Sequence, residues 1–334
     1  MKLGRMVGSV VGVLLVLAMV VWGAGDDVTQ LERMVVFPER NLLIEPGAES
    51  LALTPAMVEL TSEDLRIIKP ATASDALMAA PGIHTETRGR KYKQFHSFRG
   101  QIYPYPDVAL DGIWQREARE IFYVYPGAAI DQIRIMRSAS ALFYGLTDIV
   151  GVIDVRPRRP ELRTERQRTY QVGTEAGTHG TYRVYGMGDV SFDEKRAVNV
   201  GAQFYRTDGR SGRNAAEEFY SAFGSAVFQP DPDHRFQVGA WALHGFRELE
   251  RPDPDGPAMQ SLKNRDERYD PMTYSHLNVR GFHRWTEASS TDWSLFYSDR
   301  RARYKRVKLD PDGPGPACGI GWFNRLPVLA FHWA

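Results

Sequence analysis

Period-two alternation along residues 168–305 is the feature that most constrains the fold of this chain. In the run from Val198 to Tyr205, apolar residues alternate with polar or small ones, which gives an extended strand two chemically different sides. Short polar turns separate successive runs of this kind. We therefore expect about seven antiparallel strands. They lie near residues 168–176, 179–191, 196–208, 217–229, 234–248, 272–286 and 290–305.

These predicted strands are long for a soluble sheet, where about 5 or 6 residues are usual. Their length is typical of tilted strands that cross a membrane. The polar segment 249–271 then fits an extracellular loop. A soluble β-sandwich is the alternative interpretation. Aromatic residues near the strand ends are typical of membrane interfaces, and they are Tyr205, Phe228, Trp285 and Trp293.

The first 25 residues have the pattern of an export signal. Lys2 and Arg5 precede an uncharged apolar run from Val10 to Trp22, and small residues follow at 23–25. A membrane anchor is the alternative, but a helix that spans a bilayer needs roughly 20 apolar residues. We therefore expect a signal peptide over residues 1–25, and a protein that leaves the cytoplasm.

Composition and motifs exclude several functions. The 42 Lys and Arg residues balance the 41 Asp and Glu residues, so no charge excess indicates nucleic-acid binding. A single cysteine, Cys318, excludes an internal disulfide and a multi-cysteine metal site. The sequence has no G-x-S-x-G, H-E-x-x-H or phosphate-loop motif, and the acids Glu217 and Glu218 would face opposite sides of a strand. We predict that the chain is not an enzyme, with a periplasmic hydrolase as the alternative. His84 and His96 are expected to be surface polar residues rather than metal ligands.

Residues 51–160 have the pattern of a compact mixed α/β unit. A strand-like stretch at 58–60 precedes Thr61, which is followed by acids in an N-cap pattern. A helical segment over 72–80 stops at Pro81-Gly82. The stretch 108–110 predicts a strand that enters a tight turn at Asp111-Gly112. Two more strands are expected, at 130–136 and 149–155.

Seven motifs in this unit resemble, in order, those of the plug domain of TonB-dependent outer-membrane receptors. They are Thr61–Leu65, Asp75–Ile83, Phe98–Gly100, Val108–Ile113, Ile130–Arg137, Ala141–Gly145 and Gly151–Val155. The motif residues that the resemblance marks are Arg99, Gly100, Asp111, Gly112, Arg137, Tyr144, Gly145 and Gly151. Arg134, Ser138 and Val150 depart from the family pattern. Because the family uses charges in this region to hold the plug against the barrel, we expect that contact to differ here.

A segment between the signal and the plug resembles the family's TonB box. It consists of Glu32, Arg33, Met34, Val35, Val36 and Phe37, of which Arg33 and Phe37 depart from the common form. An extended, β-prone segment on a polar leader can add as a strand to the edge of a partner's sheet. The resemblance therefore implies TonB as a partner, with ExbB and ExbD.

The resemblance implies a mixed α/β plug domain followed by antiparallel transmembrane β-strands. Plugged transporter barrels have about 22 strands, so about seven would be an incomplete β-barrel. The expected parts are a signal peptide at 1–25, a periplasmic leader at 26–50, the plug at 51–160, barrel strands at 161–310 and an irregular or out-of-frame tail at 311–334. We expect a C-terminally truncated chain.

The function implied by the resemblance is TonB-dependent active transport of a metal chelate across the outer membrane. The implied substrates are ferric siderophores, haem or cobalamin, with outer-membrane lipid as surroundings, no nucleic-acid partner and no resident cofactor. Basic and aromatic residues of the plug's apex loops suit anionic, ring-bearing chelates. These candidates are Arg88, Arg90, Lys91, Lys93, Tyr103 and Tyr105. A non-transporting fragment, or a small outer-membrane or adhesion β-protein, is the alternative.

Overall fold

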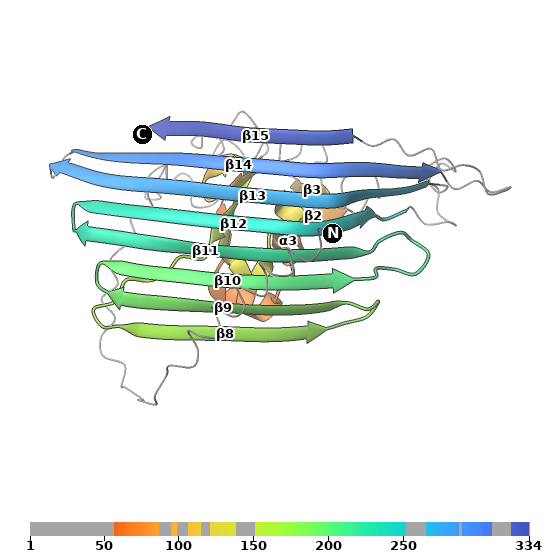
Figure 1. The fold of residues 1–334 in the computed structure, drawn as a ribbon, viewed down its shortest axis with the longest axis horizontal. Helices are drawn as coiled ribbons and strands as arrows, with labels where there is room; N and C mark the ends of the chain where they lie inside the picture. Colours follow the sequence, from red (N-terminus) through yellow and green to blue (C-terminus); the bar gives the residue numbers. More distant parts are fainter. Residues whose placement is uncertain are drawn as a thin grey trace, which may run out of the picture. The chain divides into compact units, whose positions relative to one another are not determined.

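The computed structural model describes residues 57–86, 95–98, 106–114, 121–137, 151–251, 265–286, 289–308 and 322–333. All of them belong to one compact unit, Asn41–Ala334. A five-stranded sheet lies in the first part of this unit, called the plug below (described residues up to 160). An eight-stranded sheet, called the wall below, makes up the rest (Figure 1). No helix within the described ranges is long and apolar enough to cross a membrane.

The two helices of the plug begin where the sequence predicts. After β1 (Met57–Leu60), helix α2 (Ser62–Ile68) starts at Thr61, whose hydroxyl accepts from the Asp64 N–H at 3.3 Å. The Asp64 carboxylate accepts in return from the Thr61 N–H at 2.8 Å, which completes a capping box. Helix α3 (Ala73–Leu77) is capped in the same way by Thr72 and Asp75. It is shorter than the predicted span 72–80.

The plug sheet has the strand order β1-β6-β7-β4-β5. It contains β4 (Asp107–Leu110), β5 (Ile113–Trp114), β6 (Ile130–Arg137) and β7 (Gly151–Pro157), and a separate hairpin pairs β2 (Ile83–Glu86) with β3 (Phe95–Phe98). Between β4 and β5, Asp111 and Gly112 both have positive φ, 57° and 76°. This is the predicted tight hairpin turn. The core of the plug includes Leu77, Leu110, Ile133, Ile135 and Ile153, all of them buried.

The wall pairs its strands in sequence order, each antiparallel to the next. The seven predicted strands are confirmed, and the total is eight. The strands are β8 (Gln167–Ala176), β9 (Tyr182–Asp193), β10 (Arg196–Thr207), β11 (Glu217–Asp231), β12 (His234–Leu249), β13 (Arg265–Thr286), β14 (Ser289–Lys308) and β15 (Trp322–Trp333). Within the described residues the sheet is open, with β8 and β15 as its end strands.

Two parts of the wall differ from the prediction. Strand β13 begins at Arg265, so residues 265–271 belong to a strand and not to the predicted loop 249–271. Strand β15 lies in the segment 311–334 that we expected to be irregular. It pairs with β14 from Trp293↔Trp333 to Tyr304↔Trp322. As the last strand of the described sheet it tolerates Pro327, which has no N–H to donate to a second neighbour.

The two sides of the wall differ in chemistry. The outer side carries exposed apolar residues, such as Val172, of which 78% is exposed, Val200 and Val238. The opposite side buries polar residues toward the plug, among them Gln203 and Gln237. A soluble sandwich would bury its apolar side, so this polarity contradicts that alternative. Apolar outward and polar inward is the arrangement of transmembrane β-barrels.

Aromatic side chains gather at both ends of the outer side. The rings of Tyr182, Phe204 and Tyr220 follow one another at centroid distances of 5.5 and 4.8 Å, and Phe228 lies 6.4 Å from Phe236 at the other end. These pairs resemble the interface girdles of membrane barrels. Our assignment of Tyr205 to such a girdle is wrong, because Tyr205 is buried on the inner side. Its neighbour Phe204 points the other way, as strand alternation requires.

Candidate functional site

Many of the residues predicted to be functional lie outside the described residues, so those assignments stay predictions. They are the TonB-box-like segment 32–37, the apex residues Arg88, Arg90, Lys91, Lys93, Tyr103 and Tyr105, and the motif residues Arg99, Gly100, Tyr144 and Gly145. Arg137 ends β6, and Gly151 opens β7 with a φ of 146°. Asp111 and Gly112 are the motif residues that the structure places in contact with the wall or beside that contact.

Asp111 joins the plug to the wall through its carboxylate. Within the plug, Arg159 donates to Oδ1 at 2.5 Å. From β13 of the wall, the Asn278 amide donates to Oδ2 at 2.7 Å and the Arg280 guanidinium lies 3.0 Å from the same oxygen. Arg280 also donates to the main-chain carbonyl of Asp111. The left-handed turn thus presents both the carboxylate and the carbonyl of one residue to the wall.

A second acid stands behind this contact. Asp154 of β7 accepts from the Gly112 N–H at 2.8 Å and pairs with Arg156 at 2.6 Å. The cluster therefore buries charges of both signs in one place. Burial by itself raises the pKa of Asp111, but the charges of Arg159, Arg280 and Arg156 outweigh it. The pKa of Asp111 lies below its usual range, so the carboxylate is ionised at any physiological pH.

Further wall residues bind the main chain of the plug. Arg183 of β9 donates to the carbonyl of Pro70, in the segment between α2 and α3. Gln203 of β10 donates to the Ala71 carbonyl at 2.9 Å and accepts from the Ala128 N–H at 3.3 Å. These are contacts to peptide groups: every residue type supplies the carbonyl, and every type except proline supplies the N–H. The wall side chains therefore matter more for this docking than the plug side chains they contact.

Arg247 of β12 makes the same kind of contact from a fully buried position. Its guanidinium donates to the Tyr123 carbonyl at 2.6 Å and to the Glu217 carboxylate of β11 at 3.0 Å. It also lies over the rings of Tyr123 and Phe219, at 5.7 and 5.4 Å from their centroids. Glu217 and Glu218 do face opposite sides of the strand, because Glu218 accepts from the Tyr220 hydroxyl on the outer side.

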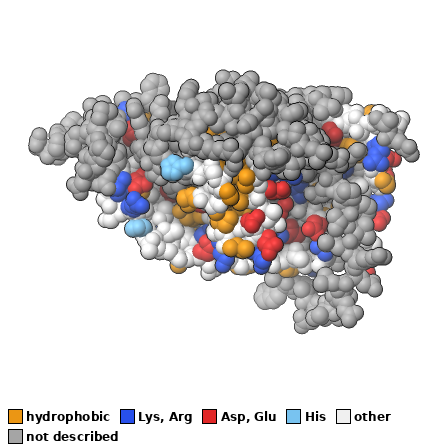
Figure 2. Space-filling model, turned by 180° about the vertical axis from the view of Figure 1, so that it is seen from behind, with side chains coloured by type: hydrophobic (Ala, Val, Ile, Leu, Met, Phe, Trp, Pro, Cys, Tyr) orange, Lys and Arg blue, Asp and Glu red, His pale blue; other side chains and the backbone are white. Residues whose placement is uncertain are grey.

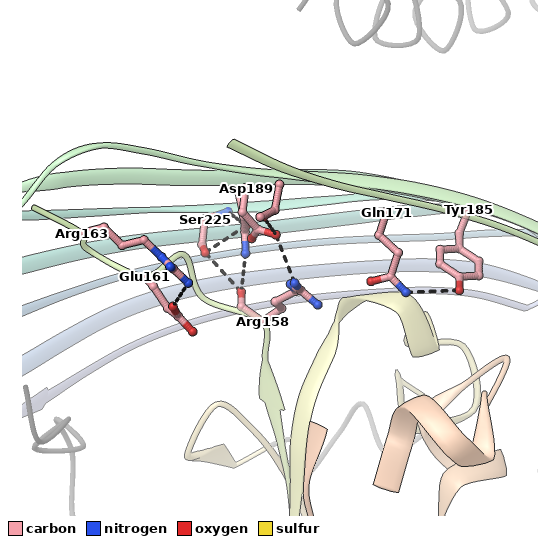
Figure 3. A network of polar contacts seen from close by, with 9 residues as sticks. Arg158, Glu161, Arg163, Gln171, Tyr185, Asp189 and Ser225 are labelled. Carbon is pink, nitrogen blue, oxygen red and sulfur yellow. Dashed lines mark hydrogen bonds and ion pairs between the residues drawn. The ribbon is translucent and has the colours of Figure 1, made fainter. Parts of the chain in front are cut away.

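Arg158, just after β7, forms a further link (Figure 3). Its side chain points to Asp189 of β9, with a distance of 3.1 Å between guanidinium and carboxylate. Its carbonyl accepts from the Asn199 amide at 2.8 Å and from the Ser225 hydroxyl at 3.3 Å. The plug is therefore bonded to wall strands β9, β10, β11 and β12, and to β13.

The face of the molecule turned away from the view in Figure 1 is chemically mixed. Hydrophobic side chains of the described residues lie beside acidic and basic ones there (Figure 2).

Arg134, one of the three departures from the family pattern, has an acidic partner within the plug. Its guanidinium lies 3.9 Å from the Glu59 carboxylate, and the two residues are directly paired across β6 and β1. The change to arginine is thus matched by an acid on the neighbouring strand. The sequence alone does not single out the wall residues Arg183, Arg247, Asn278 and Arg280. A pattern that could have indicated them is the recurrence of strong hydrogen-bond donors on one side of the alternating strands, opposite the side with the apolar residues.

The two histidines of the plug differ from each other. His84 is exposed as expected, but the expectation for His96 is wrong, because only 6% of it is exposed. Its Nε2 lies 3.1 Å from the Ser74 hydroxyl of α3, and its ring stacks on Tyr123 at 5.9 Å. Within the part of the chain that the structure describes, no group of three or more His, Cys, Asp or Glu side chains could hold a metal ion.

Acid should destabilise the plug through His96. Burial lowers the pKa of His96 from 6.5 to about 4, so the folded state favours the neutral ring. The unfolded chain takes up the proton first as the pH falls below about 6.5, and stability is lost down to about pH 4, by up to ~3 kcal/mol. His96→Gln keeps a hydrogen-bonding group near Ser74 but does not titrate. Denaturant midpoints at pH 7.5 and 4.5 should therefore differ less in the variant than in the unaltered chain; equal differences would contradict this account.

The fold and the interface together define a class of protein: a folded α/β domain bonded to the inner, polar side of strands whose outer side suits lipid. Residues 50–152 match the family described as TonB-dependent Receptor Plug Domain. This part of the chain is therefore a plug domain of the TonB-dependent receptors, and the strands after it have the fold of such receptors, which confirms the resemblance, the fold class and the predicted outer-membrane localisation. Plug domains of this family belong to receptors and not to enzymes, so the prediction that the chain is not an enzyme is confirmed as well.

Known relatives agree with this assignment. The chain is 23% identical over 285 residues to the iron-regulated outer membrane virulence protein of Vibrio cholerae, covering 79% of this chain and 42% of the relative. Its fold is similar to P. aeruginosa FpvA in a ferric pyoverdine complex, with a TM-score of 0.65, 14% identity, and coverage of 83% of this chain and 38% of FpvA. The alcaligin receptor FauA of Bordetella pertussis matches with a TM-score of 0.57 and 17% identity, and the match covers 75% of this chain and 41% of FauA. The chain thus spans less than half the length of these relatives.

Proposed function

We propose that this chain acts in TonB-dependent import of a metal chelate across the outer membrane, with the plug as the gate. The observation that carries the proposal is the bonding of a folded plug to the inner side of membrane-type strands, with Asp111 and Arg280 at its centre. The contacts are hydrogen bonds and ion pairs, which can break and re-form. A relative named for iron regulation and two named for siderophores support ferric chelates as the substrate class.

Opening such a gate requires work. A charge-assisted hydrogen bond contributes about 1.5–3 kcal/mol and a neutral one about 0.5–1.5 kcal/mol, so several of them together hold the plug firmly. The outer membrane has no ATP. A tether to an energised inner-membrane partner supplies the force, and the TonB-box-like segment 32–37 is our candidate for the part that TonB captures, with ExbB and ExbD behind it.

Substrate contacts are assigned to the apex loops of the plug. Arg88, Arg90, Lys91 and Lys93 offer positive charge, and Tyr103 and Tyr105 offer aromatic rings. Such a set suits an anionic chelate with ring-bearing ligands, of the siderophore, haem or cobalamin class. Losing Arg88 and Arg90 together should raise the dissociation constant of such a chelate without changing how the plug is bonded to the wall.

Val35→Pro should abolish uptake while leaving substrate binding intact in a protein with a complete barrel. Proline has no N–H, so it removes a main-chain bond from the strand that residues 32–37 would add to the partner's sheet. The measurement is accumulation of a ⁵⁵Fe-loaded siderophore by energised cells, beside binding in cells without energy. Val35→Ala keeps the N–H and serves as the control, with uptake retained. Undiminished uptake by Val35→Pro would remove this segment from the mechanism.

A further inference from the structure

The surroundings of Asp111 have the composition of an anion-binding site. Three side chains donate to its carboxylate or pair with it: Arg159 from the plug, and Asn278 and Arg280 from the wall. Asp111 and Arg280 are each 1% exposed. Two guanidinium groups and an amide around one carboxylate are what a protein uses to bind a free carboxylate or a similar oxyanion.

The donors at this site exceed what Asp111 uses. Nε and Nη1 of Arg280 are buried and find no hydrogen-bond partner among the described residues, and the same holds for Nε of Arg159. Nε1 of Trp241, on the neighbouring strand β12, is also buried with no partner in the described part of the chain. An unsatisfied buried donor costs about 1–3 kcal/mol. The site therefore offers more N–H groups than one aspartate can accept from.

Of these donors, only Trp241 lines the cavity beside the site; Arg280 and Arg159 do not reach it, and they face Asp111 instead. This cavity between plug and wall is lined by Asp111, Asn278, His276 and Trp241, with Tyr125 on the plug side. Asn278 and His276 belong to β13, the strand that also carries Arg280. In the proposed transport the plug moves and Asp111 leaves with it, whereas these three residues of β13 stay on the wall. The wall half of the site would then be left with an arginine that has lost its counter-charge.

We propose that Arg280 and Asn278 form an anion-binding site on the inner wall, which Asp111 occupies as a built-in ligand while the plug is docked. Once the plug has moved, the same site receives an anionic oxygen of the cargo, such as a carboxylate. This rests on the proposed function and deepens it, since it restricts the cargo to an anionic class. In the space that the plug vacates, the guanidinium of Arg280 keeps its charge and its donors and has lost the carboxylate that it paired with. It therefore attracts a passing anion.

Formate is the probe for this site, because it is a carboxylate without a side chain. Asp111→Gly empties the site and keeps the turn, since glycine adopts the φ of 57° found here without strain. In the purified chain, 100 mM sodium formate should raise the melting temperature of Asp111→Gly by about 3–6 °C over the same concentration of chloride. The unaltered chain, whose site is filled, should melt at the same temperature in both salts.

Arg280→Gln supplies the decisive comparison. Added to Asp111→Gly, it should abolish the response to formate, because the main donor is gone. Asp111→Ala also empties the site, at a cost of about 1–2 kcal/mol for a positive φ, and tests the same claim if the glycine variant does not fold. Its melting temperature should also rise in formate, and only while Arg280 is present. Equal melting in formate and chloride for whichever of these variants folds, or a response that survives Arg280→Gln, would overturn the proposal. The measurement involves neither TonB nor uptake, so it can fail while the proposed transport holds.

Discussion

Replacing Arg280 with glutamine should weaken the docking of the plug by about 3–5 kcal/mol, the usual cost of removing one partner of a buried ion pair. Asp111 would keep Arg159 but lose its charged partner on the wall, and both residues of the pair are almost wholly buried. The expected result is faster hydrogen exchange in plug strands β4 and β5, and a lower denaturant midpoint for the plug. Strands β8–β10, which do not contact Arg280, should exchange as before.

A double variant tests whether the loss comes from an unpaired buried charge or from the changed side-chain volume. Asp111→Asn together with Arg280→Gln removes both charges, so no ion is left buried and most of the loss should be recovered. Arg284→Gln on the same strand is the matched control. Arg284 lies 3.7 Å from Asp233 with 40% of its side chain exposed, and its loss should change stability by less than about 0.5 kcal/mol. Additive effects of the two single substitutions would mean that Asp111 and Arg280 do not act as a pair.

The turn at Asp111-Gly112 could be predicted from the sequence, but the pairing of Asp111 with Arg280 of the wall could not. An aspartate and a glycine after an apolar strand favour positive φ, and that preference is local. Arg280 is 169 residues further along the chain. Alternation tells which side of β13 a residue faces, but which plug residue it meets depends on strand registers and on the docking of two domains. No local pattern contains that information.

The same limit explains the errors within the wall. Alternation reports the chemical difference between two sides of a strand, so it detects strands that separate lipid from plug, such as β10. It does not report main-chain pairing. Residues 265–271 are polar on both sides, yet Glu267 and Arg268 still pair with β12 and β14. Burial of His96 was missed for a related reason, since its neighbours Ser74 and Tyr123 come from distant parts of the chain.

Because wall side chains bind main-chain acceptors of the plug, the two sides of this interface should differ in how well they tolerate substitution. Arg183 and Gln203 donate to the carbonyls of Pro70 and Ala71, and Arg247 donates to that of Tyr123. Most substitutions in these plug segments keep the carbonyl in place, whereas a change of the wall residue removes the donor. The inner positions of the wall should therefore tolerate substitution less well than the plug segments they bind.

Arg247→Met should lower the free energy of unfolding by about 3–5 kcal/mol. This is as large as the effect expected for Arg280→Gln, but it arises in a different part of the molecule. Glu217 and Arg247 face each other directly across β11 and β12, at 3.0 Å, with side chains 1% and 2% exposed. Methionine fills much of the volume but leaves the glutamate without its arginine. Hydrogen exchange should then rise at the Glu217 end of β11 and the Leu249 end of β12.

Glu217→Gln combined with Arg247→Met should recover most of that loss, because a neutral pair of similar volume leaves no buried charge. The bond to the Tyr123 carbonyl would still be missing, so the plug segment near Tyr123 should exchange faster in both the single and the double variant. Arg206→Met, at a side chain 47% exposed on β10, is the control and should be nearly neutral. If the double variant were as unstable as the single one, the contribution of Arg247 would be its contact with the plug and not its pairing with Glu217. The wall would then depend on the docked plug for its own stability, because the bond across to Tyr123, and not the charge pair within the sheet, would be what holds β11 and β12 together at that end.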